Sequence, residues 1–379
     1  FVILYEIKDA ADTWMAVAYL FSDESARDIA GRAANRIYIP EWNGVLQRFP
    51  YDFRIRHLRV AADPRRARKH LNPVLKKAGK KWRGFKFDTA IPRGYWPGKR
   101  CQFEYCGDNG LDGRKRFYAK VYREWQGRDV IALHGALREA GLDGRNGFQV
   151  PRPIGFCEHL RAAIFEPGSG SPLFDLLDKP DGKAGVESAG TLLAAIHQID
   201  VPMPNPRHSA KNEIALVSGW CEVFDAVKPD MARKIRVLCD QLAVYQPRKE
   251  RRLCTAHRDF YDKQVLYSPS RTTALDLDTA CMAPAGLDLG NFCAHLTLRG
   301  LQRHGDSEHF KEHASRFVNA YRKAGGGCES RNIAWYQAMS LLRLAGLYAL
   351  QLHDSAVIGG LVQEAASISD EFTLGAAQK

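Results

Sequence analysis

Polar residues in the second half of the chain have types and spacing suited to phosphoryl transfer. The run HRDFYDKQ occupies residues 257–264, and LDLD follows at 275–278. Short apolar stretches flank the first run and a Ser-Pro-Ser turn separates the two, which predicts a hairpin that brings Asp259, Gln264 and Asp276 to one edge. There one carboxylate would take the proton of an acceptor hydroxyl. The other carboxylate and the amide oxygen would hold Mg²⁺ on the phosphates.

Short strands are expected on both sides of this loop. Leu253 and Cys254 supply an apolar start, Val265 and Leu266 follow the polar run, and 273–277 has the alternation of a return strand. A polar hairpin held by a buried salt bridge is the plainer alternative. That alternative leaves the ordered series of acidic residues unexplained.

The same residues resemble the protein-kinase-like phosphotransferases, specifically the branch of aminoglycoside and choline kinases. That family has a catalytic loop His-x-Asp-x-x-x-x-Asn, then Ile-Asp-Phe/Trp-Asp and then Asp-Leu. His257, Asp259, Asp276 and the pair Asp288-Leu289 match by type and order. The resemblance implies that Asp259 is the catalytic base and that Asp276 is the principal Mg²⁺ ligand, with ATP as the phosphate donor. It also implies that Asp288 anchors the catalytic loop.

Gln264 departs from the family, which usually has Asn at this place. Its amide oxygen sits on a longer arm, so Gln264 could be the second metal ligand with a shifted loop, or it could mark a site with reduced metal affinity. Arg258 is expected to pair with a carboxylate or with the transferring phosphate.

These residues need a smaller lobe that holds the nucleotide phosphates. Lys120 lies in an alternating strand, 116–122, and the resemblance assigns such a lysine to the α- and β-phosphates; a surface strand lysine is the alternative. Glu139, on a predicted helix at 128–140, is the expected partner of Lys120, and Asp129 is the other candidate. The glycine-bearing loop at 107–114 has no G-x-G-x-x-G pattern and carries little of the argument.

The lobes would be joined by the segment that begins at Glu166. Its Glu-Pro-Gly-Ser-Gly-Ser-Pro-Leu sequence resembles the family's hinge, which contacts adenine through backbone groups. Pro167 has no N–H to donate, which moves the expected donor to Gly168. A plain Gly/Ser/Pro loop is the alternative, and the position between Lys120 and Asp259 favours the hinge.

Bulk composition limits the class of protein. The 379 residues are 45% hydrophobic, enough for a large core, and no apolar run approaches the roughly 18 residues of a membrane span. No signal peptide is visible, although the chain begins with Phe1, so an N-terminal targeting segment stays open. Nine cysteines without zinc-like spacing indicate reduced thiols, and we expect a cytoplasmic protein.

Positive charge is concentrated near the N-terminus. Of the net +12, residues 1–100 contribute 21 Lys/Arg against 10 Asp/Glu, and 54–100 contribute 16 against 2. This field predicts an anionic partner; a solvated basic face is the alternative. It argues against a polycationic acceptor near this region. No aromatic residues are interleaved in a nucleic-acid motif, which disfavours a nucleic-acid partner.

The N-terminal segment is expected to form its own module. Strands at 2–7 and 14–21, a turn at 9–12 and a helix at 23–34 resemble the later strand–loop–strand–helix series, a faint internal repeat without the lysine. A basic helix that starts at Asp63 and Pro64 is predicted next. The Pro- and Gly-rich remainder of 61–100 is interpreted as a linker.

The C-terminal part is predicted to be mostly helical. His197, on one of these helices, is expected to pack behind the catalytic loop. The helix at 334–350 has apolar residues nearly all round its axis and should be buried. Helices are expected at 189–199, 220–242 (one or two), 287–298, 308–324 and 334–350.

The sequence therefore predicts an α+β, protein-kinase-like two-lobed fold with an N-terminal α/β extension. Its parts would be a basic cap-like module (1–100), an N-lobe with hinge (101–168) and a helical C-lobe with the acceptor site (169–379). The expected activity is transfer of the γ-phosphate of ATP to a hydroxyl of a small molecule such as a sugar or amino alcohol. The alternative is a catalytically impaired, nucleotide-binding scaffold protein with an anionic partner.

Overall fold

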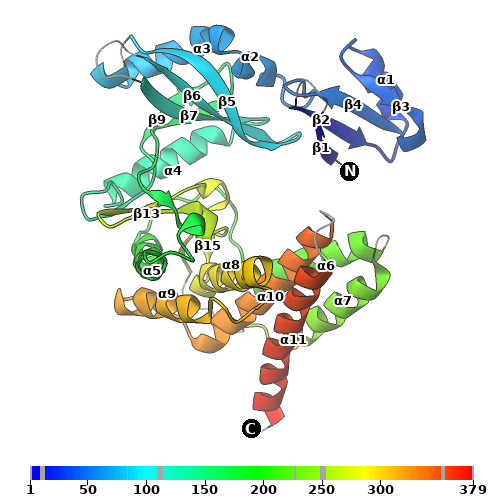
Figure 1. Ribbon diagram of the computed structural model, residues 1–379, viewed down its shortest axis with the longest axis vertical. Helices are drawn as coiled ribbons and strands as arrows, with labels where there is room; N and C mark the ends of the chain where they lie inside the picture. The colour runs from blue at the N-terminus through cyan, green and yellow to red at the C-terminus, as the bar shows by residue number, and fades with distance from the viewer. Residues whose placement is uncertain are drawn as a thin grey trace. The chain divides into compact units, whose positions relative to one another are not determined.

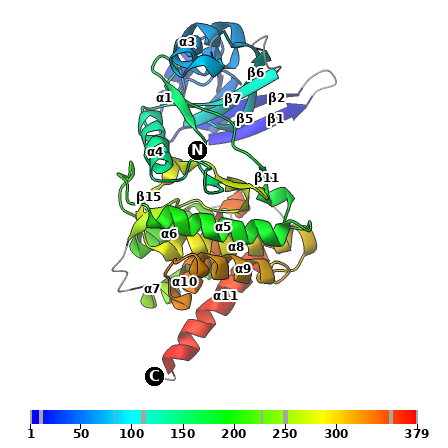
Figure 2. The same ribbon diagram turned by 90° about the vertical axis from the view of Figure 1, so that its left-hand side faces the viewer.

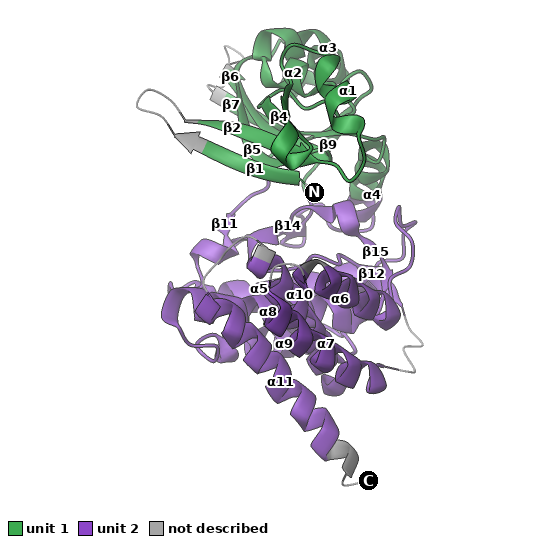
Figure 3. Ribbon diagram, turned by 90° about the vertical axis from the view of Figure 1, so that its right-hand side faces the viewer, with its two compact units in different colours: residues 1–135, 151–167 green, residues 136–150, 168–379 purple. Residues whose placement is uncertain are grey.

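The computed structural model divides the chain into two compact units (Figure 3), namely residues 1–135 with 151–167, and residues 136–150 with 168–379. It describes residues 2–8, 13–82, 84–108, 114–225, 228–247, 253–350 and 355–377. The predicted turn at 9–12 and most of the glycine-bearing loop, 109–113, lie outside the described residues.

The first unit begins with a four-stranded antiparallel sheet in the order β1-β2-β4-β3 (Figure 1). Helix α1 (Ser25–Gly31) packs on it through Ala26 and Ala30, which contact Val45. The predicted strand–strand–helix order of this region is confirmed. The strands are β1 (Val2–Lys8), β2 (Thr13–Leu20), β3 (Ile37–Ile39) and β4 (Gly44–Arg48).

Two helices follow, α2 (Leu58–Ala62) and α3 (Pro64–Lys77). As predicted, Asp63 caps α3: its Oδ1 accepts hydrogen bonds from the backbone N–H groups of the second and third helical residues. The buried residues of α3 recur every fourth position and form one apolar stripe: Ala67, Leu71 and Leu75.

This stripe packs on a five-stranded antiparallel sheet in the order β5-β6-β7-β10-β9. The interpretation of 61–100 as helix and linker is wrong after residue 86, because 86–96 form β5, an edge strand. Pro92 and Gly94 sit where the pairing register shifts, and an edge strand tolerates them there. The strands are β5 (Lys86–Trp96), β6 (Arg100–Asp108), β7 (Arg114–Tyr122), β9 (Pro153–Cys157) and β10 (Ala162–Phe165).

The two faces of this sheet are covered by different helices. Helix α3 covers a face with closely packed aromatic rings, among them Phe87, Tyr105 and Phe117. Helix α4 (Gly127–Glu139) packs Val130 against Tyr122 and against β10, on the other face.

The second unit is mainly helical. Helices α5 and α9 run side by side, and α8 pairs with α10 (Figure 2). Every predicted helix is present, 220–242 contains parts of two, and α11 was not predicted. The helices are α5 (Gly182–Gln198), α6 (Ala210–Asp225), α7 (Pro229–Val244), α8 (Ala285–His304), α9 (Lys311–Lys323), α10 (Ser330–Leu350) and α11 (Ser355–Ala377).

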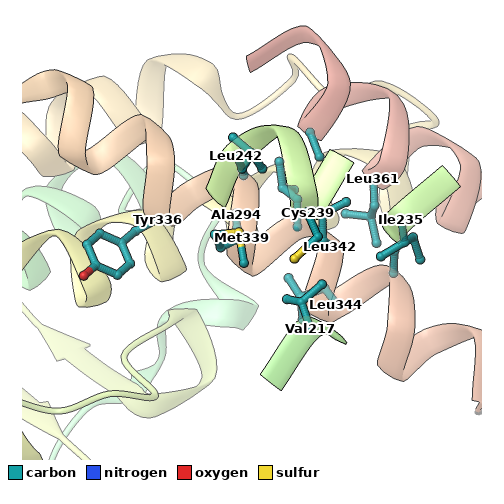
Figure 4. Packing of buried hydrophobic residues seen from close by; sticks show 14 of the residues in the cluster. Val217, Ile235, Cys239, Leu242, Ala294, Tyr336, Met339, Leu342, Leu344 and Leu361 are labelled. Atoms are coloured by element: carbon teal, nitrogen blue, oxygen red, sulfur yellow. The ribbon is translucent and has the colours of Figure 1, made fainter. Parts of the chain in front are cut away.

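The core of the second unit forms around α10, which is buried as predicted. Met339 and Leu342 of this helix meet Cys239 and Leu242 of α7 and Leu361 of α11 (Figure 4). Both faces of α10 are therefore covered, which explains why apolar residues surround its axis.

Short strands complete the second unit. The strands β11 (Ser171–Pro172), β13 (Val265–Ser268), β14 (Arg271–Ala274) and β8 (Phe148–Gln149) form one small sheet, and β12 (Cys254–Ala256) pairs with β15 (Cys281–Ala283). The predicted hairpin is thus β13–β14, but its return strand ends at Ala274. The next residues leave the strand because Asp276 adopts a left-handed backbone conformation (φ 55°).

Candidate active site

Asp288, in the first turn of α8, is the hub of the candidate site. Its carboxylate is fully buried and accepts hydrogen bonds from the backbone N–H of His257 (2.7 Å) and of Arg258 (2.6 Å). His197 Nε2 lies 3.0 Å from the same carboxylate, and His197 Nδ1 lies 3.0 Å from the Tyr321 hydroxyl. The predicted roles of Asp288 as a backbone anchor and of His197 as a structural residue are confirmed.

The side chain of His257 joins the two predicted catalytic segments. Its Nε2 lies 2.7 Å from the carbonyl oxygen of Leu275, the residue before Asp276, so Nε2 carries the proton. The backbone N–H of Asp259 in turn donates to His257 Nδ1 (3.4 Å). One neutral imidazole therefore holds the backbone at Asp259 and the backbone next to Asp276.

The phenol of Tyr261 lies in the electrostatic field of the neighbouring aspartates, Asp262 included. Burial raises the pKa of Tyr261 well above its ordinary value, and the negative charges of Asp259 and Asp276 raise it further. Gln264 lies beside them along the backbone: its carbonyl accepts from the N–H of Leu275 (2.8 Å) and its N–H donates to the Tyr261 carbonyl (2.9 Å). Hydrogen bonds thus join the backbone at Asp259, at Gln264 and at Leu275, the residue before Asp276.

Arg258 lies in the electrostatic field of a buried carboxylate. Burial alone would raise the pKa of Glu213, but the hydrogen bond from His208 and the charges of Arg343 and Arg258 lower it below its ordinary value. Whether Arg258 pairs with a carboxylate or with the transferring phosphate stays a prediction. Because Arg258 also has a left-handed backbone (φ 69°), its position is tightly defined.

Several supporting residues were missed by sequence reasoning. Asn291 donates to the carbonyl of Phe260 (3.0 Å) and accepts from Arg343, and His295 stacks on Tyr261 with ring centroids 4.0 Å apart. A signal was present, because Asp288, Asn291 and His295 follow the spacing i, i+3, i+7 that places residues on one face of a helix. Near this face, Asp262 forms a buried ion pair with Arg299 (2.9 Å).

Another set of metal-ligating side chains occurs on the surface of the second unit. Among the described residues, Asp178, His304 and His309 have ligand atoms within 4.8 Å of one another. The two imidazoles stack face to face at 3.5 Å, whereas a coordinated ion lies in the plane of each ring. Arg303 also pairs with Asp178, so this cluster is already balanced in charge and is poorly arranged for a cation.

Lys120 belongs to the first unit. It is 6% exposed, lies in β7 between Gln102 of β6 and Ala163 of β10, and shares its face of the sheet with Tyr122. Helix α4 covers this face, and the buried polar residue that it brings there is His134, whose ring lies 4.6 Å from that of Phe165.

The expected partner of Lys120 is not on this buried face of α4. Glu139 is exposed and is the last residue of the helix, and Asp129 is exposed in the first turn. This placement argues against Glu139 as the residue that holds Lys120. Whether Glu139 holds Lys120 stays a prediction.

The predicted hinge residues are fixed by different neighbours. The Glu166 carboxylate accepts from Trp82 Nε1 (3.3 Å) and pairs with Lys81 Nζ (2.8 Å), both from the segment before β5. A Cβ atom on Gly168 would lie 2.8 Å from the end of the Leu266 side chain, which would have to shift to admit a larger residue. Whether these residues contact adenine stays a prediction.

Sequence comparison identifies the class of protein. The family model described as the phosphotransferase enzyme family matches residues 110–326, more than half of the chain. The chain belongs to this family, as the motif resemblance implied. No curated protein matches the chain significantly in sequence.

Solved structures with a similar fold are kinases of small molecules. A choline/ethanolamine kinase family protein from Mesorhizobium loti is 16% identical (TM-score 0.51, 79% of this chain and 94% of that chain). Spectinomycin phosphotransferase in complex with ADP and spectinomycin is 14% identical (0.52, 75% and 94%). Choline kinase from Cryptosporidium parvum Iowa II is 13% identical (0.58, 81% and 97%). These similarities confirm the α+β, protein-kinase-like two-lobed fold.

Proposed function

We propose that this phosphotransferase moves the γ-phosphate of ATP to a hydroxyl of a small molecule such as a sugar or an amino alcohol. The observation that carries the proposal is the bond from His257 to the Leu275 carbonyl, which links the loops bearing Asp259 and Asp276. Family membership supports phosphoryl transfer, and the structurally similar spectinomycin phosphotransferase binds ADP.

Asp259 would accept the proton of the acceptor hydroxyl, or orient it for attack. The bond from His257 to the Leu275 carbonyl ties the loop of Asp259 to the residue before Asp276, which supports a shared site for the two carboxylates. The oxygens of Asp276 and Gln264 are of the kind that Mg²⁺ prefers. Bound Mg²⁺ would supply neutralisation of the phosphate charges, and these two residues would hold it.

Lys120 and the predicted hinge would supply the remaining contacts with the nucleotide. Lys120 would pair with the α- and β-phosphates, and the backbone around Glu166 and Gly168 would contact adenine. Arg258, the neighbour of Asp259 in the chain, would pair with the transferring phosphate or with a carboxylate. Catalysis would rest on positioning and charge neutralisation, as is usual for phosphoryl transfer.

The substitution Asp259→Asn tests the central assignment. It keeps the side-chain shape but removes the proton acceptor, so we expect turnover to fall by about 10²–10⁴-fold while binding of Mg-ATP is retained. Turnover over a panel of sugars and amino alcohols, with calorimetric titration of Mg-ATP, measures both. Asp230→Asn, at an exposed site in the same unit, should leave both unchanged. Near-normal turnover of the Asp259 variant would refute its role.

A catalytically impaired, nucleotide-binding scaffold is the second candidate. It is favoured by Gln264 in place of the usual Asn, because the longer side chain would have to reach a metal ion with a shifted loop. Gln264→Asn distinguishes the two functions. A wild-type chain that binds Mg-ATP without turnover, with activity restored in the variant, would support the scaffold and overturn the kinase proposal.

The compartment proposed for this enzyme is the cytoplasm. All nine cysteines are free thiols and six of them are buried, as expected where thiols stay reduced. Among the helices in the described ranges, none combines the length and apolar character that crossing a bilayer requires.

A further inference from the structure

A pocket of the first unit is lined almost entirely by basic side chains. It has a volume of about 460 Å³. All its lining residues belong to the first unit, so it shares none with the proposed catalytic assembly of the second unit. We call it the basic pocket, and its lining residues are Phe53, Arg54, Arg56, His57, Arg123, Glu124 and Arg161.

Three separate segments build the basic pocket. Residues 53–57 precede α2, Arg123 follows β7, and Arg161 lies in the turn between β9 and β10. The backbone fixes these segments: the N–H of Arg123 donates to the carbonyl of Lys99 (2.8 Å), and the Arg161 carbonyl accepts from the N–H of Tyr122 (3.0 Å). The cationic lining is therefore part of the folded sheet.

Aromatic rings hold two of the guanidinium groups in place. Arg161 lies over the ring of Trp125 (4.6 Å) and Arg54 lies over the ring of Tyr19 (4.8 Å). Arg161 Nη1 donates to the carbonyl of Arg123, and the stacked faces leave the other N–H groups of the two guanidiniums at their edges for acceptors. This arrangement suits planar, bidentate recognition of phosphate oxygens.

The arginines that line the basic pocket outnumber its acidic residues. Glu124 is the one acidic lining residue, 2.9 Å from Arg123 and 3.8 Å from Arg161. Burial and then the neighbouring His159, Arg161 and Arg56 lower the pKa of His57, as expected in a positive field.

An adjoining pocket of about 520 Å³ extends this field. It shares Phe53 and Arg56 with the basic pocket and adds the side chains of Arg32, Arg36 and Arg59. Asp52 also lines it, but this carboxylate is buried and already accepts from the Tyr95 hydroxyl and from backbone N–H groups. Several guanidinium groups thus surround two connected concave sites.

We propose that the basic pocket binds a small anion carrying two or more phosphate groups. Its volume lies within the range of small-molecule sites, and its like charges repel one another until an anion neutralises them. A compact polyphosphorylated ligand fits this concavity better than an extended nucleic acid, whose backbone would need a continuous basic track. The site would be separate from the one that holds the reacting nucleotide.

Isothermal titration of the full chain with sodium pyrophosphate tests this proposal. We expect saturable binding at about 0.15 M salt, weakened roughly 10-fold or more in Arg56→Gln/Arg123→Gln, because two charge-assisted contacts are lost. Both arginines are exposed, so the variant should keep its melting temperature. Glu124→Gln should bind about 3-fold more tightly, since it removes the opposing carboxylate. Arg27→Gln, an exposed arginine on α1, is the matched control.

Binding must also be separated from the proposed catalytic site. Lys120→Met should retain pyrophosphate binding, whereas loss of binding in this variant would place the anion at the nucleotide site and overturn the proposal. Absence of binding to the wild type, or equal affinity in all variants, would do the same. Tighter binding of single-stranded oligonucleotides through Arg56 and Arg123, with a steep salt dependence, would assign the surface to nucleic acid instead.

Discussion

The two units support their candidate functional residues by different means. In the second unit, the buried carboxylate of Asp288 and the imidazole of His257 hold the backbone beside Asp259 and Asp276. In the first unit, Lys120 sits in the central strand of a sheet, and its backbone is paired with β6 on one side and β10 on the other. Hydrogen bonds to side chains hold the backbone beside Asp259 and Asp276, whereas strand pairing holds the backbone at Lys120.

This difference explains how the two regions respond to substitution. A buried carboxylate that accepts backbone hydrogen bonds has no substitute of equal shape and charge, so the second unit depends on individual residues. Backbone pairing does not depend on side-chain identity, so the first unit should tolerate change at Lys120 structurally while losing its electrostatic contribution.

The largest expected effect is that of Asp288→Ala. The change leaves two buried backbone N–H groups and His197 without their acceptor, and we expect the free energy of unfolding to fall by about 3 kcal/mol or more. Chemical denaturation followed by circular dichroism measures this loss. Asp230→Ala, at a site that is 91% exposed, should cost less than about 0.5 kcal/mol. A similar small cost at Asp288 would remove the contrast between the units.

An intermediate effect, on activity rather than stability, is expected for Lys120→Met. The substitution keeps a long apolar stem within β7 but removes the ammonium group, so kcat/KM for ATP should fall roughly 100-fold with a small change in melting temperature. Glu139→Gln is the matched test of the predicted partner. Because Glu139 is exposed at the end of α4, we expect its kcat/KM to stay within about 2-fold of the wild type. A loss equal to that of Lys120→Met would restore Glu139 as the partner.

The smallest expected effect concerns the pH dependence of stability. Burial lowers the pKa of His295, and the charges of Arg299, Arg343 and Lys263 lower it further. The folded chain therefore keeps His295 neutral while the unfolded chain binds a proton below about pH 6.5. The unfolding free energy should fall as pH drops through this value, by up to about 1.4 kcal/mol per pH unit from this group.

His295→Gln removes this contribution. Denaturation of the wild type and the variant between about pH 5.5 and 7.5 should show a shallower slope for the variant. The slope should not vanish, because burial also lowers the pKa of His57, His70 and His313. Identical slopes would mean that His295 is protonated in the folded chain.

The fold could be predicted from the sequence where one physical rule dominated. The Asp63 cap, the buried α10 and the β13–β14 hairpin followed from capping, periodicity and turn residues. Strand β5 was missed because Pro92 and Gly94 indicate a break, and only the neighbouring strand β6 makes an edge strand there favourable. Long-range pairing of this kind leaves little trace in the local sequence.

Residues of the candidate site were easiest to select from the sequence where few residue types can do the required chemistry. Asp259, Asp276 and Asp288 stand out because few residue types can accept protons, ligate cations or receive buried backbone N–H groups. The partner of Lys120 was harder to predict, because the choice between Glu139 and the buried face of α4 depends on the rotation of the helix about its axis. Asn291 and Arg343 act through contacts between helices that are distant in sequence.

Strand β5 has a consequence for the smallest chain that could work as an enzyme. A chain that began at residue 101 would lack β5, the edge strand of the five-stranded sheet. It would also lack Lys81 and Trp82, which bind the Glu166 carboxylate. The uncovered backbone of β6 would then invite pairing with other chains. The part of the fold that carries Lys120 and supports Glu166 therefore starts upstream of Lys80. It lies partly within residues 1–100, which the basic charge and the prolines had led us to interpret as a separate extension.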